Sequence, residues 1–430
     1  MLKLSKNRPP VFTTSFVVLS ILLLLAPMLA PAVRGAGQTY LIAILFDVGG
    51  RGDLSFNDMA AYGAEQAKTS LAGQGYTVEV SYATPRSMAD FEPTLESYAS
   101  SGRYTLIACI GFLWSDALNA TAFKYPNQKF MIIDSVVAAP NVASVVFREN
   151  EASAMVGAAA AIATKSGKVA VVLGMEIPLL WKFEIGFAFG AKWMAQRLGK
   201  DITISYYYTG TFGDPNKGKE AAITFLDQGA DVIYAAAGAT GLGVLEACQQ
   251  RAVATNKPIF SIGVDADQDY LYPGYILCSA RKKVDFGVQS TVEAAVKGTF
   301  TSGVVELGLK EGGVSMSTPA DMIVWADFLR GADYTEQQIT DAETKIQNMY
   351  NTYLSAKQAD LDELKSNIIS GNIQVPVPTQ NTIANLRTQY IGTFSSGIPL
   401  TWILAGAVIV IIVAAAGYYY FFMKRKPATK

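Results

Sequence analysis

Carboxylates recur in this sequence shortly after apolar runs, and Asp47, Asp116 and Asp265 each stand in such a place. Aromatic side chains accompany the first two, because Phe56 and Trp114 follow the same runs. A carboxylate accepts O–H or N–H hydrogen bonds from a ligand, and an aromatic ring packs against a flat ring. The pattern therefore indicates recognition of a small polar ligand that contains a flat ring.

The stretch from Asp265 to Lys282 offers a second kind of chemistry. Asp265 begins the acidic sequence Asp-Ala-Asp-Gln-Asp, and Lys282 follows the next apolar run. A carboxylate and an ammonium group at neighbouring strand ends can together hold vicinal hydroxyls. The acidic sequence also resembles a calcium loop, but Tyr270 and Ile276 stand where such a loop needs Gly and Glu. We therefore expect neither a metal nor a cofactor.

Two glycine-rich turns join apolar runs to helical patterns. The turn after Asp47 carries three glycines before Asn57, so its backbone can take positive φ and approach a ligand. The turn at 238–243 lacks both the G-x-G-x-x-G spacing and a following lysine, so it is not a phosphate-binding loop. We expect Gly238 and Gly241 to place backbone N–H donors near a neutral polar ligand.

Several of these residues also have a purely structural interpretation. Phe56 could pack in the core of a strand-to-helix turn, and Asp116 could cap the helix that follows it. Trp181 and Phe183, which follow the apolar run at 168–173, could line a cleft or simply pack. The residues alone leave these alternatives open.

The composition excludes several classes of enzyme. The 430 residues include no histidine, which rules out a Ser-His-Asp triad, a Cys-His pair and a His-ligated zinc or haem site. Cys109, Cys248 and Cys278 are too few for a disulfide framework, and we expect them to be buried thiols. Half of the residues are hydrophobic, which is enough for a large packed core.

Both ends of the chain carry apolar segments. Residues 1–36 have the basic start, apolar stretch and small residues of a signal peptide, with no cysteine for lipid attachment. An uncleaved signal anchor is the alternative. Residues 399–423 are uncharged and apolar, and a basic tail follows at 424–430. We predict a single transmembrane helix there, with a spacer at 379–398, an extracellular main domain and a cytoplasmic tail in the cell membrane.

The predicted exterior part is acidic. The signal region and the tail hold eight basic residues and no acidic one, which leaves 27 basic against 36 acidic residues, a net charge of −9. Polymeric nucleic acid needs clustered Lys and Arg to neutralise its phosphates. We therefore expect no nucleic-acid partner.

Continuous apolar runs alternate with helical patterns along this exterior part. The predicted strands are 40–46, 78–82, 106–111, 130–134 and 142–147, then 168–173, 202–208, 232–237 and 259–263. The predicted helices are 56–70, 90–101, 149–164, 185–198, 215–228 and 241–256. This alternation is typical of parallel sheets covered by helices on both faces, with ligands at the carboxyl ends of the strands. We predict two α/β lobes, one from 38–147 and about 279–325, the other from 148–278 and about 326–378.

The ordered motifs resemble those of the basic membrane protein family of substrate-binding proteins, which includes the purine nucleoside receptor. The most specific is Ile262-Gly-Val-Asp-Ala-Asp-Gln268, followed by Ser279 and Lys282-Lys-Val-Asp285. The others are Asp47-Val-Gly-Gly with Ser55-Phe-Asn57, Gly111-Phe with Asp116, and the stretches 141–150, 210–214, 217–222 and 238–247. The resemblance covers about residues 40–376.

The resemblance implies a two-lobed type I periplasmic-binding-protein fold that closes on a small molecule and delivers it to the permease subunits of an ABC importer. In nucleoside-binding members, aromatic rings sandwich the base and an Asp–Lys pair holds the ribose. When these family contacts are transferred to matching positions of this sequence, the resemblance implies that Asp47, Phe56, Asn57 and Asp116 contact the base. Trp181 or Phe183 would be the opposing ring. The sugar contacts are Gly241, Asp265 and Lys282.

Two features depart from the family. Bacterial members carry a lipobox cysteine, whereas this chain has a C-terminal apolar segment, an arrangement that resembles archaeal surface proteins. Arg281 stands where the family usually has an apolar residue, so the choice between Lys282 and Lys283 stays open.

We predict a receptor for a nucleoside, with a purine favoured, and not an enzyme. A receptor for a sugar or another heterocycle is the first alternative, because aromatic residues favour a flat ring without choosing it. A surface hydrolase that uses paired carboxylates such as Asp47 and Asp265 is the second. A structural or adhesion protein is the third, and it would lack a deep pocket between the lobes.

Overall fold

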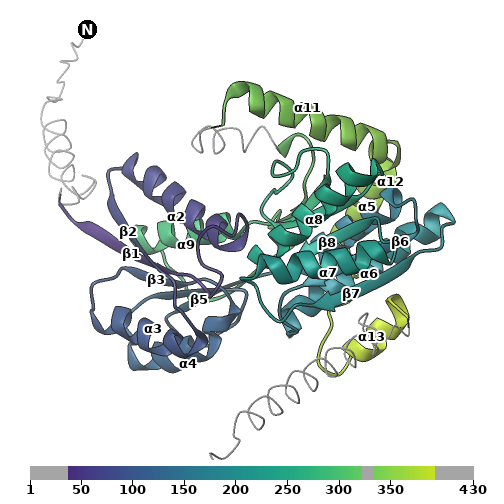
Figure 1. Ribbon diagram of the computed structural model, residues 1–430. Helices are drawn as coiled ribbons and strands as arrows, with labels where there is room; N and C mark the ends of the chain where they lie inside the picture. The colour runs from purple at the N-terminus through teal and green to yellow at the C-terminus, as the bar shows by residue number, and fades with distance from the viewer. Residues whose placement is uncertain (1–36, 322–333, 393–430) are drawn as a thin grey trace, which may run out of the picture. The chain divides into compact units, whose positions relative to one another are not determined.

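Two six-stranded sheets form the framework of this protein. The computed structural model describes residues 37–321 and 334–392. Figure 1 shows each sheet with helices packed on both of its faces. We call the first sheet with its helices lobe 1 and the second sheet with its helices lobe 2.

The sheet of lobe 1 has the order β11-β5-β4-β3-β1-β2. Its strands are β1 (Thr39–Leu45), β2 (Thr77–Ala83), β3 (Leu106–Cys109), β4 (Phe130–Ile133), β5 (Val142–Phe147) and β11 (Gly303–Leu307). Its helices are α2 (Phe56–Ala72), α3 (Phe91–Ser100), α4 (Ser115–Lys124) and α9 (Val284–Lys297), with the 3₁₀ turns η2 (Met88–Asp90) and η3 (Phe112–Trp114). Ile42 and Ile44 pack with α2 and α9, whereas Ala43 and Leu45 pack with α3 and α4. Successive side chains point to opposite faces, so a strand covered on both faces must be apolar throughout.

The sheet of lobe 2 has the order β12-β10-β9-β8-β6-β7. Its strands are β6 (Lys168–Leu173), β7 (Thr203–Tyr208), β8 (Val232–Ala236), β9 (Phe260–Asp265), β10 (Ile276–Lys282) and β12 (Val314–Met316). Its helices are α5 (Glu149–Ala163), α6 (Pro178–Leu198), α7 (Pro215–Asp227) and α8 (Ala239–Thr255). Val169 and Val171 pack with α5 and α6, and Ala170 and Val172 pack with α7 and α8. β12 runs antiparallel to β10, and the other recorded pairs of this sheet are parallel.

In the described part of the chain, the backbone passes between the lobes at three neighbouring places: Arg148 before α5, Lys283 before α9, and residues 308–313 between β11 and β12. The backbone N–H of Arg148 donates to the Leu307 carbonyl at 3.1 Å, and that of Lys283 to the Gly313 carbonyl at 2.8 Å. Short adjacent connections of this kind can act as a hinge between lobes.

Glycines allow α5 and α6 to pack backbone against backbone. A Cβ atom at Gly157 would lie 2.1 Å from the Phe187 carbonyl oxygen, and one at Gly190 would lie 1.8 Å from the Ala154 carbonyl oxygen. No side chain fits at such distances, so this helix pair requires glycine at both positions. The position of α6 is therefore fixed closely against α5.

Within residues 334–392, three further helices follow the second sheet. They are α11 (Glu336–Tyr353), α12 (Gln358–Ile369) and α13 (Ile383–Tyr390), with the 3₁₀ turn η4 (Ser355–Lys357) before α12. α12 packs on α5, and α13 packs on α6. The side-chain amide of Asn150 donates to the Val375 carbonyl at 2.9 Å, which ties the segment between α12 and α13 to the start of α5.

The structure confirms the predicted pair of α/β lobes and corrects one part of the fold prediction. Among the described helices, none combines the length and the apolar character needed to cross a membrane. The segment 399–423, for which we predicted a transmembrane helix, lies outside the described residues. The fold is therefore corrected to the two lobes and the helices that follow them.

Candidate functional site

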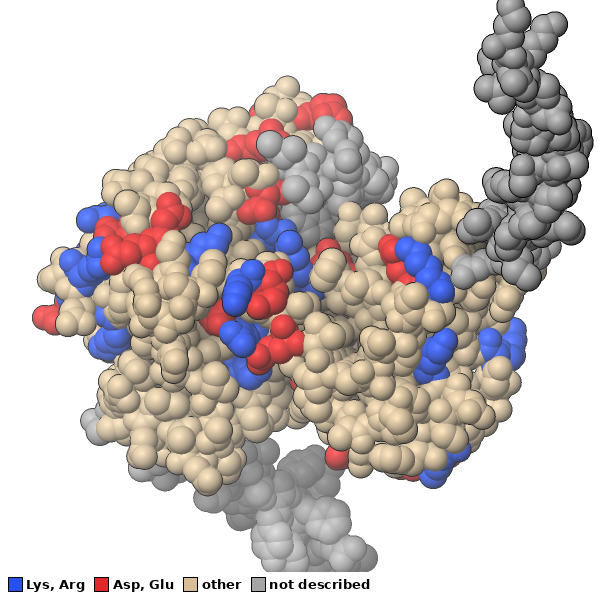
Figure 2. All heavy atoms as spheres, turned by 180° about the vertical axis from the view of Figure 1, so that it is seen from behind, with Lys and Arg blue, Asp and Glu red and all other residues tan. Residues whose placement is uncertain are grey.

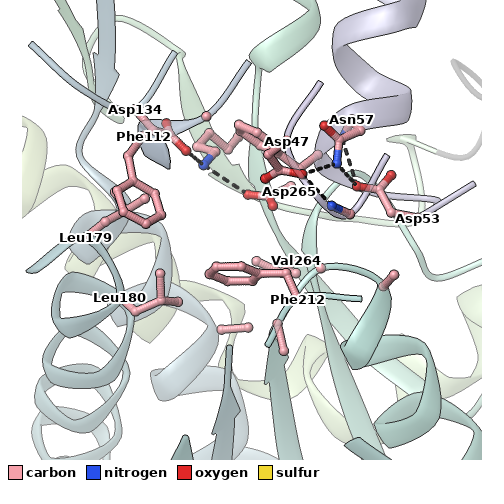
Figure 3. Close-up of a pocket in the computed structure, with 18 of the residues that line it drawn as sticks. Asp47, Asp53, Asn57, Phe112, Asp134, Leu179, Leu180, Phe212, Val264 and Asp265 are labelled. Atoms are coloured by element: carbon pink, nitrogen blue, oxygen red, sulfur yellow. Dashed lines mark hydrogen bonds and ion pairs between the residues drawn. The ribbon is translucent and has the colours of Figure 1, made fainter. Parts of the chain in front are cut away.

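A cavity of about 50 Å³ lies where strand ends of the two lobes meet. Lobe 1 contributes Asp47, Gly49, Asp53, Phe56, Asn57, Gly111, Phe112 and Asp134 to its wall, and lobe 2 contributes Leu179, Leu180, Phe183, Phe212, residues 236–239, Val264, Asp265 and Lys282. Figure 3 shows the carboxyl groups gathered on one side, with Leu180, Phe212 and Val264 across from them. An apolar wall with a few convergent polar groups is typical of a small-molecule site.

Lys282, at the end of β10, forms the centre of an ion-pair cluster. Its Nζ lies 2.7 Å from Oδ2 of Asp134 and 3.4 Å from Oδ1 of Asp265. The same Nζ lies 4.7 Å from the centroid of the Phe56 ring, within the range of a cation–π contact. Burial alone would lower the pKa of Lys282, but Asp134, Asp265 and Glu149 together raise it, so the ammonium group stays charged. Because Asp134 belongs to lobe 1, this cluster also joins the lobes.

The two carboxylates that hold Lys282 have an unusual backbone conformation. Asp134 has φ of 67° and Asp265 has φ of 62°, both in the left-handed region. Asp enters this region more readily than most residues, yet the conformation still carries strain. Such strain persists where the surrounding structure requires it, and it often marks a ligand site.

Asn57 is oriented by two carboxylates. Its Nδ2 donates to Oδ1 of Asp47 at 3.0 Å and to Oδ2 of Asp53 at 3.1 Å. Asp53 also accepts the backbone N–H groups of Ser55, Asn57 and Asp58, and so satisfies donors at the start of α2. Since both amide hydrogens are used, Asn57 presents its Oδ1 as a hydrogen-bond acceptor.

Unsatisfied acceptors are a common feature of this site. Among the described residues, no donor reaches the buried atoms Asn57 Oδ1, Asp134 Oδ1 or Asp265 Oδ1, although the last stays within ion-pair distance of Lys282. Burial raises the pKa of Asp47 against the hydrogen bonds from Asn57 and Gly49, and it raises the pKa of Asp265 against the attraction of Lys282. Each unsatisfied buried group costs about 1–3 kcal/mol. A ligand rich in N–H and O–H donors would remove this cost.

The cavity brings together most of the ligand-binding residues predicted from the sequence. Those that line it are Asp47, Phe56, Asn57, Phe183, Gly238, Asp265 and Lys282. They come from six different strand ends and helix starts, as expected where parallel strands end at one edge. Lys282, and not Lys283, is the lysine that lines the cavity.

Trp114 and Asp116 do not line the cavity, so their predicted placement is corrected. Trp114 is fully buried in lobe 1, where its ring meets that of Phe91 edge to face at 4.3 Å. Asp116 is exposed in the first turn of α4, where a carboxylate is favoured by the positive end of the helix dipole. Trp114 is the last residue of the turn η3 and Asp116 follows it in α4, whereas Phe112, the first residue of η3, reaches the cavity.

Trp181 and Gly241 are also absent from the cavity wall. Trp181 packs with Ile185 and Ile383 on the opposite side of α6 from the cavity. Gly241 lies inside α8, and its N–H already donates to the Gly238 carbonyl at 2.9 Å, so it is not free for a ligand. Trp181 and Gly241 were predicted to contact the ligand, but neither of them lies in the cavity wall.

Four prominent wall residues were not predicted from the sequence: Phe112, Asp134, Leu180 and Phe212. Asp134 could have been found, because it ends a predicted strand just as Asp47 and Asp265 do. Phe112 and Phe212 lie in glycine-containing turns whose course the sequence does not determine. Leu180 lies in a helical turn that the sequence analysis placed in a loop.

The model of a family described as "ABC transporter substrate-binding protein PnrA-like" matches residues 41–376 of the chain. The chain belongs to this family. The match includes both lobes and every residue of the cavity wall, and it ends before α13.

Proteins similar to this chain occur in several organisms. An uncharacterised lipoprotein of Pyrococcus abyssi is 39% identical over 83% of this chain and 90% of its own length. The ABC transporter nucleoside-binding protein BmpA of Lactococcus lactis is 32% identical over 78% of this chain and 88% of its own length. A crystal structure of a solute-binding protein of an ABC transporter system from Aeropyrum pernix has a TM-score of 0.77 and 37% identity, and covers 82% of this chain and 98% of that one.

These findings confirm that the chain is a substrate-binding protein of the ABC transporter class and not an enzyme. They also correct the predicted location. Three similar proteins of Pyrococcus species are named lipoproteins, which does not support a single-pass C-terminal anchor, and no described helix supports it either. All three cysteines of this chain are buried in the lobes.

Proposed function

We propose that the cavity binds a nucleoside, with a purine base favoured, and that the protein delivers it to the permease subunits of an ABC importer. The observation that carries this proposal is the Asp265–Lys282 pair, which lies beside aromatic rings and unsatisfied acceptors in one cavity. A nucleoside offers the matching groups in one molecule: hydroxyls on the sugar, a flat ring, and N–H groups on the base. The name of the Lactococcus relative supports the same class of ligand.

The sugar is expected to lie at the Asp265–Lys282 pair. Oδ1 of Asp265 can accept a hydroxyl hydrogen, and the Lys282 ammonium can donate to the oxygen of the neighbouring hydroxyl. Asp134 adds a third charged partner at 2.7 Å from Lys282. Two hydroxyls on adjacent carbons fit this arrangement better than an isolated one.

The base is expected to lie among Phe56, Phe112, Phe183 and Phe212, which all line the cavity. Stacking of a base on an aromatic side chain contributes about 1–3 kcal/mol. Asn57 offers only its oxygen, and Asp47 is a further acceptor beside it. The edge of the base that reaches these residues must therefore carry N–H donors.

The lobes must separate to admit such a ligand. The cavity of about 50 Å³ is far smaller than the roughly 300–1,000 Å³ of typical ligand pockets. Besides the Asp134–Lys282 ion pair, two hydrogen bonds join the lobes here: Ser55 Oγ donates to the Val264 carbonyl at 2.8 Å, and Gln268 Nε2 to the Leu54 carbonyl at 3.1 Å. Rotation at the three chain passages would break these contacts and widen the cavity.

The surface is consistent with a small-molecule ligand. Figure 2 shows basic and acidic side chains side by side on one face of the molecule, without separation by sign. Ion pairs among the described residues, such as Arg197 with Asp360 at 2.8 Å, neutralise basic groups locally. Binding of a nucleic-acid polymer would instead need clustered basic residues.

Calorimetric titration of the whole protein with nucleosides, free bases and sugars tests the proposal. We expect saturable binding of a purine nucleoside, and a loss of at least about a hundredfold in affinity in Asp265→Ala and in Phe56→Ala. Asp116→Ala is the matched control, because its exposed carboxylate lies outside the cavity, and it should bind as the wild type does. Binding of only a sugar or a non-nucleoside heterocycle would overturn the nucleoside assignment.

A substitution at Gly174 should block the cavity without touching a polar group. A Cβ atom at Gly174, just after β6, would lie 2.1 Å from Cε1 of Phe212. Gly174→Ala is therefore expected to push the Phe212 ring into the cavity and to weaken nucleoside binding by about tenfold or more. Gly213→Ala is the control, since its Cβ atom would have only an ordinary contact at 3.9 Å. Equal affinities for the two variants in calorimetry would contradict the expectation.

A further inference from the structure

We propose that Arg387 of α13 is a positioning residue for the ligand cavity. It lies beyond residues 41–376, the part of the chain that the family model matches. The proposal rests on the ligand site proposed above, and it assigns to this C-terminal helix a part in shaping the site. Figure 1 shows α13 beside the second sheet, where it packs on α6.

The Arg387 guanidinium joins two residues that bracket one wall of the cavity. Its Nε lies 2.7 Å from Oε1 of Glu184, and its Nη2 lies 2.8 Å from Oε2 of Glu184 and 2.9 Å from Oε1 of Glu176. Glu176 precedes α6, and Glu184 lies in its second turn. Between them stand Leu179, Leu180 and Phe183, which line the cavity. One side chain thus fixes both ends of a cavity-forming segment.

The first turns of α6 have two different faces. Leu180 and Phe183 point to the cavity, whereas Trp181, Glu184 and Ile185 face α13. This division follows the helical period, because residues three and four apart share a face. A shift of α13 would therefore be transmitted through a single helical layer to the ligand.

The position of Arg387 is itself closely determined. Glu184 is fully buried, and it accepts hydrogen bonds from the Tyr208 hydroxyl at 2.6 Å and from Arg387. The Arg387 Cζ lies 4.8 Å from the centroid of the Tyr206 ring and 5.8 Å from that of Tyr208. A buried carboxylate such as that of Glu184 needs a positively charged or hydrogen-bonding partner. A bidentate guanidinium–carboxylate pair also fixes the relative orientation of the two side chains. The pair consequently sets both the distance and the rotation of α6 relative to α13.

Ligand binding and the α13 contact should then favour each other. Both stabilise the same arrangement of residues 177–183, one from the cavity side and the other from the α13 side. Any such coupling must act equally in both directions. A bound nucleoside should therefore slow amide hydrogen exchange in α13, and loss of Arg387 should weaken nucleoside binding.

The test compares Arg387→Gln with Arg197→Gln in the full chain. Arg197 also joins α6 to a C-terminal helix, through Asp360 at 2.8 Å and Glu363 at 2.5 Å, but it lies at the far end of α6 and outside the cavity wall. Each variant is titrated with adenosine and with guanosine at a temperature where it is fully folded. Amide hydrogen exchange of residues 180–183 is measured in the absence of nucleoside.

We expect Arg387→Gln to weaken nucleoside binding by about tenfold and to speed exchange at residues 180–183. Arg197→Gln should change neither quantity. A lower unfolding temperature for Arg387→Gln with wild-type affinity and wild-type exchange would show a merely structural role and overturn the proposal. If Arg387→Gln does not fold, Arg387→Lys takes its place, because a lysine keeps the charge but cannot hold both carboxylates in the same way.

Failure of the proposed function is distinguishable from failure of this inference. If the wild type binds neither nucleoside, the proposed ligand is wrong, and the exchange of residues 180–183 still shows whether Arg387 orders the segment. If the wild type binds a nucleoside and Arg387→Gln binds it equally well, the ligand stands and the positioning role is wrong.

Discussion

Replacing Lys282 by methionine is expected to abolish nucleoside binding and to lower the free energy of unfolding by about 3–5 kcal/mol near neutral pH. Lys282 is 4% exposed, and it compensates the buried carboxylates of Asp134, Asp265 and Glu149. Methionine fills a similar volume but removes the cation shared by Asp134 and Asp265, whereas Glu149 keeps Lys182 at 2.9 Å. Urea unfolding and calorimetry of the variant measure the two effects.

The loss of stability should shrink as the pH falls. In the wild type, burial already raises the pKa of Asp265, and Lys282 opposes that shift, so removal of Lys282 raises this pKa further. A carboxyl group with a raised pKa in the folded state favours folding when it is protonated. Its contribution is complete below the unfolded pKa and is lost as the pH rises through the folded pKa. Unfolding at about pH 5 and at neutral pH should therefore show a smaller deficit at the lower pH.

Lys283→Met is the matched control for this prediction. Lys283 precedes α9 and does not line the cavity, although its backbone N–H contributes to one passage between the lobes. The side-chain change should leave both the affinity and the stability near the wild-type values. Equal effects of the two substitutions would mean that the charge cluster around Lys282 is not what stabilises this region.

Gly190→Ala is expected to lower the free energy of unfolding by about 3 kcal/mol, the upper part of the usual range for overpacking. The added Cβ atom would lie 1.8 Å from the Ala154 carbonyl oxygen, so α5 and α6 must move apart along their contact. The gain in helix propensity from glycine to alanine offsets only about 1 kcal/mol. Because α6 also carries Leu179, Leu180 and Phe183, the movement should weaken ligand binding as well.

Gly73→Ala separates this packing effect from a general effect of removing glycine. Gly73 ends α2 with φ of −61°, and a Cβ atom there would meet its nearest neighbour at an ordinary 3.5 Å. We expect this control to be neutral or slightly stabilising, by about 0.4–1 kcal/mol. Denaturant midpoints that agree for Gly190→Ala, Gly73→Ala and the wild type would contradict close packing of α5 on α6.

The sequence was sufficient to predict strands β1 to β9, but the predictions did not include β11, β12, α4 or α9. The predicted strands agree with the structure within two residues at their ends, because a parallel strand covered on both faces leaves a continuous apolar run. The start of α6 was misplaced at 185, whereas the helix begins at Pro178. Proline at a first helical position marks a helix start, but the apolar residues that follow it show no clear period because both sides of the helix are covered.

The candidate site was predictable where a residue directly ends a strand. Asp47 and Lys282 reach the cavity because the carboxyl ends of parallel strands meet at one edge of each sheet. The rule failed for Trp114 and Asp116, since the turn η3 after β3 rotates them away. It also could not distinguish Trp181 from Phe183, because that choice depends on the phase of a helix whose start the sequence did not reveal.

The left-handed backbone at Asp134 and Asp265 has an evolutionary consequence. Asparagine enters this conformation about as readily as aspartate does, so an Asp-to-Asn exchange would remove a charge at little cost to the backbone. The codons of these two amino acids differ by a single transition. The charge that the cavity presents can therefore change through one mutation at either position without added backbone strain, which opens a short mutational route toward ligands of different charge.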